Sequence, residues 1–471
     1  MFLRLHFLLI IAFGLNDLSA QELKKIGHLP YAPASLAGCW HYVDSLGGEW
    51  ALVGTSKGLS IVDVSDPTLP QERFFVPGIT NNWREVRTWN GFAYVGSEAL
   101  WSGIHIVDLR ALPDTIYSKK WHGDPANDSL IVKSHALQTA NGFLYVFGGI
   151  GTFDGAVIAD LADPWNPVVV GKYTQNYVHD GFVRGDTLYT SEIFAGWFAV
   201  LDISDKSDPK LLAIQSTPAY FNHNTELNSD GTIIFTTDER ANAPLTSYDI
   251  SDLEDIKQLD VYFPSVIPSG EVHNVRVFND FLVNPSYRGQ LTIVDASRPA
   301  NLIETAWDSL GSSLVWDADP YLPSGIVLAT AKSEGLFIYK KPEYRHACWL
   351  EGKVTDALTG APLASAKVFV VNTSNADTSR HTGWYGTGNA VPGAYFVFAE
   401  KKGYYPKIFN NVELNTNEIT ILDIELEPVL SNTNAVFGEG AIEVNPVPFS
   451  SFMNVSIASG TSKIVHAELI D

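Results

Sequence analysis

The sequence is poor in cysteine, in basic residues and in long apolar runs. Its 471 residues include 2 cysteines, and 31 Lys+Arg stand against 53 Asp+Glu, a formal net charge of −22. Two thiols are too few for a cysteine-based metal site. An acidic surface repels phosphates, so we expect no nucleic-acid partner. Beyond the N-terminus no apolar run approaches the roughly 18 residues of a membrane helix, so we predict no transmembrane segment.

The first twenty residues, MFLRLHFLLIIAFGLNDLSA, have the pattern of a secretory signal peptide. Arg4 precedes an apolar stretch, and Leu-Ser-Ala offers a small-residue cleavage site before Gln21. The apolar part is too short to span a bilayer. We therefore expect residues 1–20 to be removed and the protein to be secreted or extracellular.

One strand-and-turn pattern, GLSIVDVSDPTLP at residues 58–70, is repeated along the chain. Related segments recur at roughly 45-residue intervals, a period typical of four-stranded propeller blades. They begin at Gly58, Gly103, Gly155, Phe198, Leu245, Gln290 and Gly335. Short alternating runs bounded by turn residues fill each interval, and helical periodicity is almost absent. The pattern predicts an all-β fold with a seven-bladed β-propeller over residues 21–346.

The last repeat lacks a fourth strand of its own, and residues 22–30 (ELKKIGHLP) resemble a strand without a sheet. If they complete the seventh blade, the ring closes and leaves no long exposed edge. Cys39 and Cys348 flank this seam, and an oxidising compartment favours their pairing, so we predict a disulfide. The alternative is two unrelated buried thiols.

An aspartate ends six of the repeated strands. These residues are Asp63, Asp108, Asp160, Asp202, Asp249 and Asp295. Aspartate side chains stabilise turns by accepting from nearby backbone N–H groups. We therefore expect a structural role for all six.

The composition changes after the repeats. Residues 347–428 contain strands at short spacing with Gly/Pro turns, which predicts a small Greek-key β-sandwich. Residues 429–434 form a polar linker. Residues 435–471 again contain strand-like runs, but the sequence stops before a compact domain is complete, so we expect a partial β segment there.

Three stretches resemble known families. The propeller, through EWALVGTSKGLSIVDVSDP, WREVRTWNGFAYVGSEA and VWDADPYLPSG, resembles the choice-of-anchor B family of LVIVD-repeat proteins. That resemblance implies extracellular location and C-terminal anchoring, and no particular activity. EGKVTDALTGAPLASAKVFV and GAYFVFAEKKGYYP look like a carboxypeptidase regulatory-like domain, usually a non-catalytic spacer or binding module. NPVPFSSFMNVSI is similar to a type IX secretion sorting domain, which implies a Gram-negative outer-membrane surface or release from it.

Histidines recur at equivalent positions when the first strands of the seven units are aligned. The aligned residues are His41, Arg84, His135, His179, His223, His273 and Asp317. Glu85 and Asp180 follow two of these positions. The ends of the second strands are expected at the same face, and they carry Glu98, Glu192, Asp238, Glu239 and Arg288. We predict that one mouth of the channel gathers these residues into a ligand site.

Imidazole suits Zn²⁺ and similar divalent transition metals, so His135, His179, His223 and His273 are the candidate metal ligands. Two other interpretations stay open: the histidines plug the channel, or they form a catalytic centre. No H-E-x-x-H or G-x-S-x-G motif is present.

Three functions follow from this sequence. The first is a binding or scaffold module for an extracellular ligand, glycan or protein, anchored through the C-terminal segment. The second is a metal-dependent extracellular hydrolase or lyase that uses the same histidines. The third is an adhesin that acts through exposed aromatic loops such as those of Trp101 and Trp165.

Overall fold

The computed structural model describes residues 20–124, 129–151, 155–266, 270–311 and 313–429, together with strands Ile442–Asn445 and Asn454–Ile457. These residues form strands and turns without any helix, as the sequence predicted. Accordingly, nothing in the described ranges has the length and apolar character of a membrane-crossing helix. Residues 1–19 of the predicted signal peptide and residues 430–434 of the predicted linker lie outside the described residues.

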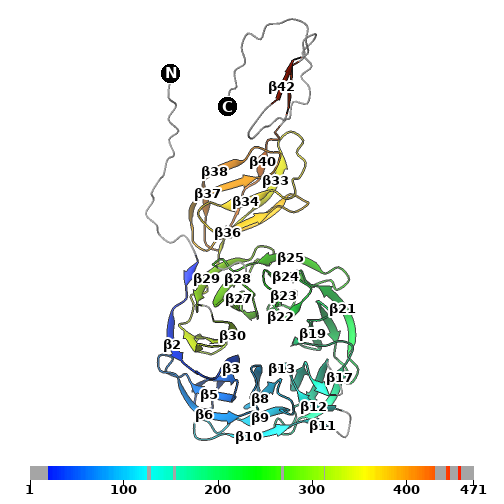
Figure 1. Cartoon of the computed structure of the whole chain (residues 1–471), viewed down its shortest axis with the longest axis vertical. Helices are drawn as coiled ribbons and strands as arrows, with labels where there is room; N and C mark the ends of the chain where they lie inside the picture. Colours follow the sequence, from blue (N-terminus) through cyan, green and yellow to red (C-terminus); the bar gives the residue numbers. More distant parts are fainter. Residues whose placement is uncertain are drawn as a thin grey trace.

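Seven sheets that carry the repeats surround a common centre, as Figure 1 shows for the described residues. The first four are β3 (Leu36–Val43), β4 (Glu49–Thr55), β5 (Gly58–Asp63), β6 (Gln71–Pro77); β7 (Arg84–Trp89), β8 (Phe92–Ser97), β9 (Ile104–Asp108), β10 (Tyr117–Trp121); β13 (Ala136–Ala140), β14 (Phe143–Phe147), β16 (Ala156–Asp160), β17 (Val168–Tyr173); and β18 (Asp180–Arg184), β19 (Thr187–Glu192), β20 (Trp197–Asp202), β21 (Lys210–Ser216).

The other three are β22 (Asn222–Leu227), β23 (Ile233–Asp238), β24 (Leu245–Asp249), β25 (Lys257–Tyr262); β26 (Arg276–Phe278), β27 (Phe281–Ser286), β28 (Gln290–Asp295), β29 (Ile303–Ser309); and β30 (Val315–Asp319), β31 (Val327–Ala331), β32 (Gly335–Tyr339), β2 (Lys25–Leu29). Each repeated strand is third in its sheet, and the first strand lies nearest the centre (Figure 1). A small sheet of β11 (Gly123–Asp124), β12 (Ser129–Lys133) and β15 (Ile150–Gly151) is added beside the ring.

Apolar side chains fill the space between neighbouring sheets. One buried cluster joins Val53 of β4 to Leu328 of β31, and another joins Leu52 of β4 to Val95 of β8. Burying apolar surface in this way is the main driving force for the fold. Because the core lies between the sheets, the centre of the ring is left for polar side chains of the first strands.

The N-terminal strand completes the last sheet. β2 pairs antiparallel with β32, with Gly27 opposite Ile338 and Leu29 opposite Leu336. The preceding β1 (Gln21–Glu22) pairs parallel with β29. Of the predicted strand at residues 22–30, residues 25–29 therefore pair with the last repeat, whereas Glu22 pairs with β29 of the preceding sheet.

The six strand-ending aspartates have the structural role predicted for them. In each case a side-chain oxygen accepts from the backbone N–H two residues later, at donor–acceptor distances of 2.6–3.1 Å. These hydrogen bonds fix the turn that follows each repeated strand.

Residues 348–426 form two further four-stranded sheets above the ring in Figure 1. One contains β33 (Cys348–Asp356), β36 (Trp384–Asn389), β39 (Ile419–Ile421) and β40 (Ile424–Leu426). The other contains β34 (Lys367–Val370), β35 (Ala376–Thr378), β37 (Gly393–Glu400) and β38 (Lys407–Leu414). Arg298 of the ring donates to both carboxylate oxygens of Glu351, at 2.7 and 2.8 Å. The terminal strands β41 (Ile442–Asn445) and β42 (Asn454–Ile457) pair antiparallel.

The predicted disulfide is not formed. Cys39 and Cys348 are both free and buried. Cys39 packs with Val53 in a core between ring sheets, whereas Cys348 packs with Leu350 in the core of the second unit. The prediction was wrong because closeness to the seam in sequence does not place two residues in the same hydrophobic core.

Candidate functional site

Four histidines lie side by side at the centre of the ring, one from each of four consecutive sheets. His135 immediately precedes β13, His179 precedes β18, His223 is in β22, and His273 lies shortly before β26. Their ring centroids are separated by 3.8, 4.4 and 4.2 Å in that order. We call these four residues the histidine layer.

Hydrogen bonds fix the orientation of three of these rings. Nδ1 of His179 donates to the carbonyl of His223 at 3.2 Å, and Nδ1 of His273 donates to the carbonyl of Trp316 at 2.6 Å. Nδ1 of His135 donates to the carboxylate of Glu98 at 2.7 Å. Carbonyl and carboxylate oxygens can only accept, so a neutral imidazole so held keeps its lone pair on Nε2. Such outer partners orient the histidine ligands of metal sites.

The environment keeps three of the imidazoles uncharged. His179, His223 and His273 are 6%, 3% and 2% exposed. Burial, and secondarily the charge of neighbouring imidazoles, lowers the pKa of each well below its usual value. Neutral imidazole is the form that binds metal ions.

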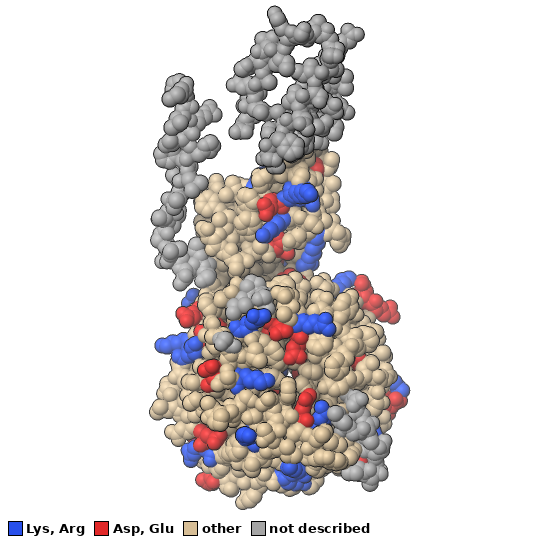
Figure 2. Space-filling view, viewed as in Figure 1, with Lys and Arg blue, Asp and Glu red and all other residues tan. Residues whose placement is uncertain are grey.

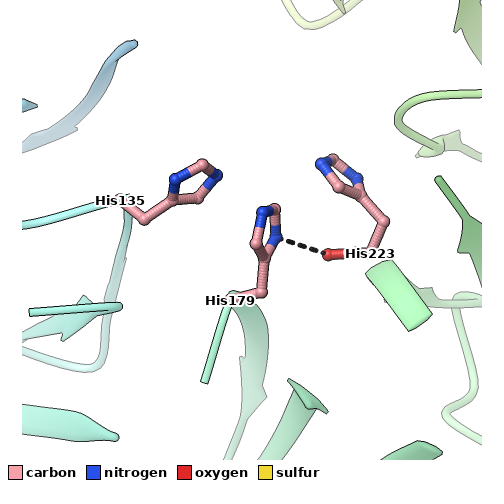
Figure 3. Close-up of side chains that lie close together, drawn as sticks. All are labelled: His135, His179 and His223. Carbon is pink, nitrogen blue, oxygen red and sulfur yellow. Dashed lines mark hydrogen bonds between the residues drawn. The ribbon is translucent and has the colours of Figure 1, made fainter. Parts of the chain in front are cut away.

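The ligand atoms form two overlapping sets. His135, His179 and His223 each bring one potential ligand atom within 4.8 Å of the others, and so do His223, Glu239 and His273. Figure 3 shows a ring nitrogen of each of the first three histidines directed toward the space between them. Metal–nitrogen bonds of about 2.0–2.1 Å would need a small inward movement of these rings. The arrangement fits a divalent transition metal.

Two predicted carboxylates lie beside this layer. Burial opposes ionisation of Glu98, but the hydrogen bond to His135 and the charges of His135 and Lys133 together outweigh burial and lower the pKa of Glu98. Oε1 of Glu239 lies 3.9 Å from Nε2 of His273, and burial raises the pKa of Glu239. These two carboxylates are only partly buried, with side chains 23% and 26% exposed, so the layer is reached from solvent on their side.

A second group of polar residues lies one to three residues after the aligned positions of the first strands. We call Glu85, Arg87, Glu226, Arg276 and Asp317 the ion-pair layer. Arg276 donates to Glu226 at 3.1 Å and to Asp317 at 2.8 Å. Nε1 of Trp316 donates to Glu85 at 3.0 Å, which links the two layers. Burial raises the pKa of Glu85 to about 7, and the neighbouring Asp317 carboxylate adds to the effect.

Arg87, Glu226 and Arg276 were not among the residues predicted from the sequence. A signal was available, because they stand two residues after Glu85, Asn224 and Asn274. Alternate residues of a strand point to the same face. If one position faces the centre of the ring, the position two residues later does so as well.

His41 does not belong to the histidine layer. It pairs with Ala51, four residues before the end of β4, whereas His223 lies beside Asn222, which pairs with the last residue of β23. At about 3.3 Å per residue this is a displacement of roughly 13 Å along the strand. His41 instead donates to Asp319 at 2.8 Å, and although burial opposes the charged form, Asp319 raises the pKa of His41.

Arg84 is also outside the layer. Its guanidinium donates to the carbonyls of Thr55 and Ile79 at 2.9 and 2.8 Å, so it is directed into the neighbouring sheet. The seventh position is taken by Trp316, whose ring centroid lies 4.7 Å from that of His273, while Asp317 belongs to the ion-pair layer.

The remaining candidates have other roles. Asp180 accepts from Asn224 at 2.7 Å beneath the histidines. Glu192 accepts from Tyr173 and Trp197, and Asp238 accepts from Thr217 and two backbone N–H groups, so both hold loops in place. Arg288 is exposed. None of Glu192, Asp238 and Arg288 contributes to either ligand set among the described residues.

The two aromatic loop residues differ from one another. Trp101 is 61% exposed. Trp165 packs on Phe92, with ring centroids 5.9 Å apart, and the Nζ atom of Lys119 lies 4.9 Å from its ring. On the face shown in Figure 2, acidic and basic side chains are interspersed over both the ring and the second unit.

Comparison with known proteins identifies two modules. Residues 45–76, 193–217 and 269–306 match the LVIVD repeat, and residues 350–427 match the carboxypeptidase regulatory-like domain. The sequence is 35% identical over 81 residues, 17% of the chain, to carboxypeptidase D of Anas platyrhynchos. The chain spans only 6% of the length of that relative. The chain therefore contains LVIVD repeats and a carboxypeptidase regulatory-like domain.

Proposed function

We propose that this chain, which contains LVIVD repeats and a carboxypeptidase regulatory-like domain, is an exported seven-bladed β-propeller that binds a divalent transition metal in its histidine layer. It acts as a binding or scaffold module for an extracellular glycan or protein. The seven sheets around one centre and the closure of the last sheet by β2 support the blade count. The two sheets of residues 348–426 support a β-sandwich that sets the propeller apart from its anchor.

One observation carries the metal site. Three buried or partly buried imidazoles, those of His135, His179 and His223, converge within 4.8 Å. Two of them are oriented by hydrogen bonds from Nδ1, as histidine ligands of metals are. Histidines that only fill a channel need no such convergence, because each buried ring nitrogen would be satisfied by a hydrogen-bond partner of its own.

The test is metal-dependent stabilisation of the full chain. A ligand present at about 100 times its Kd stabilises the folded state by about 2.7 kcal/mol. We expect Zn²⁺ to raise the melting temperature of chelator-stripped protein, and His179→Ala to abolish that rise. The exposed Arg288→Ala variant is the matched control and keeps it. Absence of any Zn²⁺ effect on the unmodified protein would refute the site.

The export proposal rests on the sequence of residues 1–20 and on the resemblance of the tail to a type IX sorting domain. The choice-of-anchor B resemblance agrees with it. We expect the protein in the medium or on the outer-membrane surface of a Gram-negative host. Protease treatment of intact cells, followed by detection of the propeller, checks this, and full protection from protease would contradict it.

Hydrolysis or elimination at the same metal is the second candidate function. Three histidine ligands leave a coordination position for water, and a metal lowers the pKa of bound water to about 7. The partial exposure of Glu98 and Glu239 provides access for a substrate. Chelator-sensitive turnover of ester and phosphoester model substrates would favour this function, and inactivity toward them in the Zn²⁺-loaded protein would favour the binding role.

An adhesin role is favoured by a different observation. Trp101, Phe194 and Tyr220 are 61%, 74% and 66% exposed on loops. Exposed aromatic rings bind sugars and peptides with little loss of conformational entropy. In that case Trp101→Ser would weaken attachment to a glycan array or host surface, and His179→Ala would leave attachment intact.

A further inference from the structure

A cleft between the first two ring sheets is lined by basic side chains and, among the described residues, by no carboxylate. Its wall contains Arg84 at the start of β7, His105 of β9 and Lys120 of β10, together with Ser97 and Ser102. The space that the centre of a water molecule can occupy inside it is about 10 Å³. A space of that size holds about one water-sized group. The cleft therefore admits a single oxygen atom and excludes a whole sugar ring.

Arg84 brings an unused hydrogen-bond donor to this cleft. The residue is 3% exposed, and its Nε and Nη2 atoms donate to the carbonyls of Thr55 and Ile79. Nη1 lies beside Gly78, where an added Cβ would be 2.9 Å from it, and makes no hydrogen bond with any described residue. Burial lowers the pKa of Arg84 to about 10, and no described carboxylate forms an ion pair with it. Buried donors normally have partners, so this one points to a ligand from solvent.

His105 and Lys120 bring further donors to the same place. They lie directly opposite one another in β9 and β10, so their side chains share one face of the sheet. Neither side chain makes a hydrogen bond or an ion pair with a described residue. Burial, followed by the effects of Lys120, Arg84 and His122, lowers the pKa of His105 to about 4, and no carboxylate opposes them. In a chain with a formal net charge of −22, such a local excess of positive charge attracts an anion.

We propose that this cleft is a binding site for an oxyanion, a carboxylate or a sulfate group, which enters with one oxygen atom. Nη1 of Arg84 and a ring N–H of His105 donate to that oxygen, and the exposed Lys120 supplies a positive charge at the opening. An ionised carboxylate only accepts hydrogen bonds, which matches a wall of donors. Hydrogen bonds between a charged donor and an anion are shorter and stronger than those between neutral groups.

The cleft lies at the same end of the strands as the histidine layer. Ser97 in its wall ends β8 and is followed by Glu98, which accepts from Nδ1 of His135. None of the candidate metal ligands belongs to the wall of the cleft. The oxyanion site and the proposed metal site can therefore be tested separately.

The experiment follows the His105 imidazole while anions are added to the full chain. Chelator-stripped protein labelled at histidine is titrated with sodium sulfate or sodium glucuronate at constant ionic strength, and the NMR signal absent from His105→Gln is recorded. We expect both anions to shift this signal and the neutral sugar glucose to leave it unchanged. Tighter binding of glucuronate would assign the site to a carboxylate carried by a larger ligand, and tighter binding of sulfate to the free inorganic ion. A signal that moves with neither anion would overturn the inference.

Three variants separate a built site from general attraction of anions. Arg84→Met is expected to weaken binding of either anion by at least about tenfold, through loss of a charge-assisted hydrogen bond. Lys120→Gln, at an exposed position where folding is unaffected, is expected to weaken it by about fivefold. Lys119→Gln is the matched control and is expected to keep the affinity, because Lys119 donates to Asn166 on the other face of the sheet. Equal losses in Lys120→Gln and Lys119→Gln would show attraction by net charge alone and would overturn the site.

Discussion

The histidine layer and the ion-pair layer are neighbours along the same first strands, but they differ in whether their buried polar groups have partners. In the ion-pair layer, Arg276 is held between Glu226 and Asp317 at 3.1 and 2.8 Å. In the histidine layer, Nδ1 of His223 and Nε2 of His273 are buried with no hydrogen-bond partner in the described ranges. The charges of the ion-pair layer lie beside charges of opposite sign and hold the ring together, whereas the Nε2 lone pair of His273 is buried without a partner and is available to a ligand.

The largest effect is expected from breaking the ion-pair layer. Arg276→Met leaves Glu226 and Asp317 buried without their partner. Breaking a buried ion pair on one side costs about 3–5 kcal/mol of the free energy of unfolding. Chemical denaturation of the metal-free protein measures this loss.

Two further variants accompany that measurement. Arg288→Met, at an exposed arginine, is expected to change the free energy of unfolding by less than about 0.5 kcal/mol. Adding Asp317→Asn to Arg276→Met removes one unpaired charge and is expected to recover part of the loss. Equal stability of Arg276→Met and Arg288→Met would contradict a structural role for the ion pairs.

A pH-dependent effect is expected at Glu85. Its pKa in the folded protein is about 7, above the value of an unfolded chain, because burial disfavours the carboxylate. The unfolded chain therefore loses this proton first, so the folded state loses stability as the pH rises from about 4.5 to about 7, and the cost is absent below the unfolded pKa. The free energy of unfolding of Glu85→Gln, measured relative to that of the unmodified protein, is expected to rise by on the order of 3 kcal/mol between pH 4.5 and 7 and then to level off. A stability difference that stays constant from pH 5 to 8 would contradict this.

A smaller loss of the free energy of unfolding is expected when the hydrogen bond that joins the two layers is removed. Trp316→Phe keeps an aromatic ring beside His273 but removes the N–H that donates to Glu85. Hydrogen bonds to charged groups contribute about 1.5–3 kcal/mol. We expect a loss of about 2 kcal/mol at pH 8, where Glu85 is ionised, and a smaller loss at pH 5. A loss that is larger at pH 5 would rule out this hydrogen bond as the cause.

The smallest effect is expected in the histidine layer itself. His223→Leu replaces a buried ring that makes no hydrogen bond within the described residues by an apolar side chain of similar size. Such replacements are nearly neutral, so the metal-free protein should lose less than about 1 kcal/mol. The same variant should lose all stabilisation by Zn²⁺. A loss as large as that of Arg276→Met would show that the layer serves structure alone.

Much of the fold was predictable because β-strands appear in the sequence as short runs in which apolar and polar residues alternate. The alternating segments at Gly58 and its six relatives each became the third strand of a sheet, and residues 25–29, within the predicted 22–30, supplied the missing strand of the last sheet. The four adjacent histidines were also predictable, since repeats place equivalent residues at equivalent points of their first strands.

Other parts of the site depend on features that residue types do not reveal. In β3 the register shifts between Leu36 and Cys39, which helps to place His41 well along the strand from the histidine layer. The direction of the Arg84 side chain follows from two acceptor carbonyls in a neighbouring turn. The two cysteines were assigned by proximity in the chain, although each belongs to a different core.

The pairing of β2 with β32 also constrains the order in which the chain can fold. Residues 25–29 cannot pair until residues 335–339 are in place, so the ring cannot close until almost all of its strands have been synthesised. Contacts between such distant segments are formed slowly, since a large loop must be closed first. Until then the edge of β32 is an open template for strands of other molecules. Loss of residues 25–29 would therefore expose the protein to strand exchange and aggregation even though every residue of the metal site is retained.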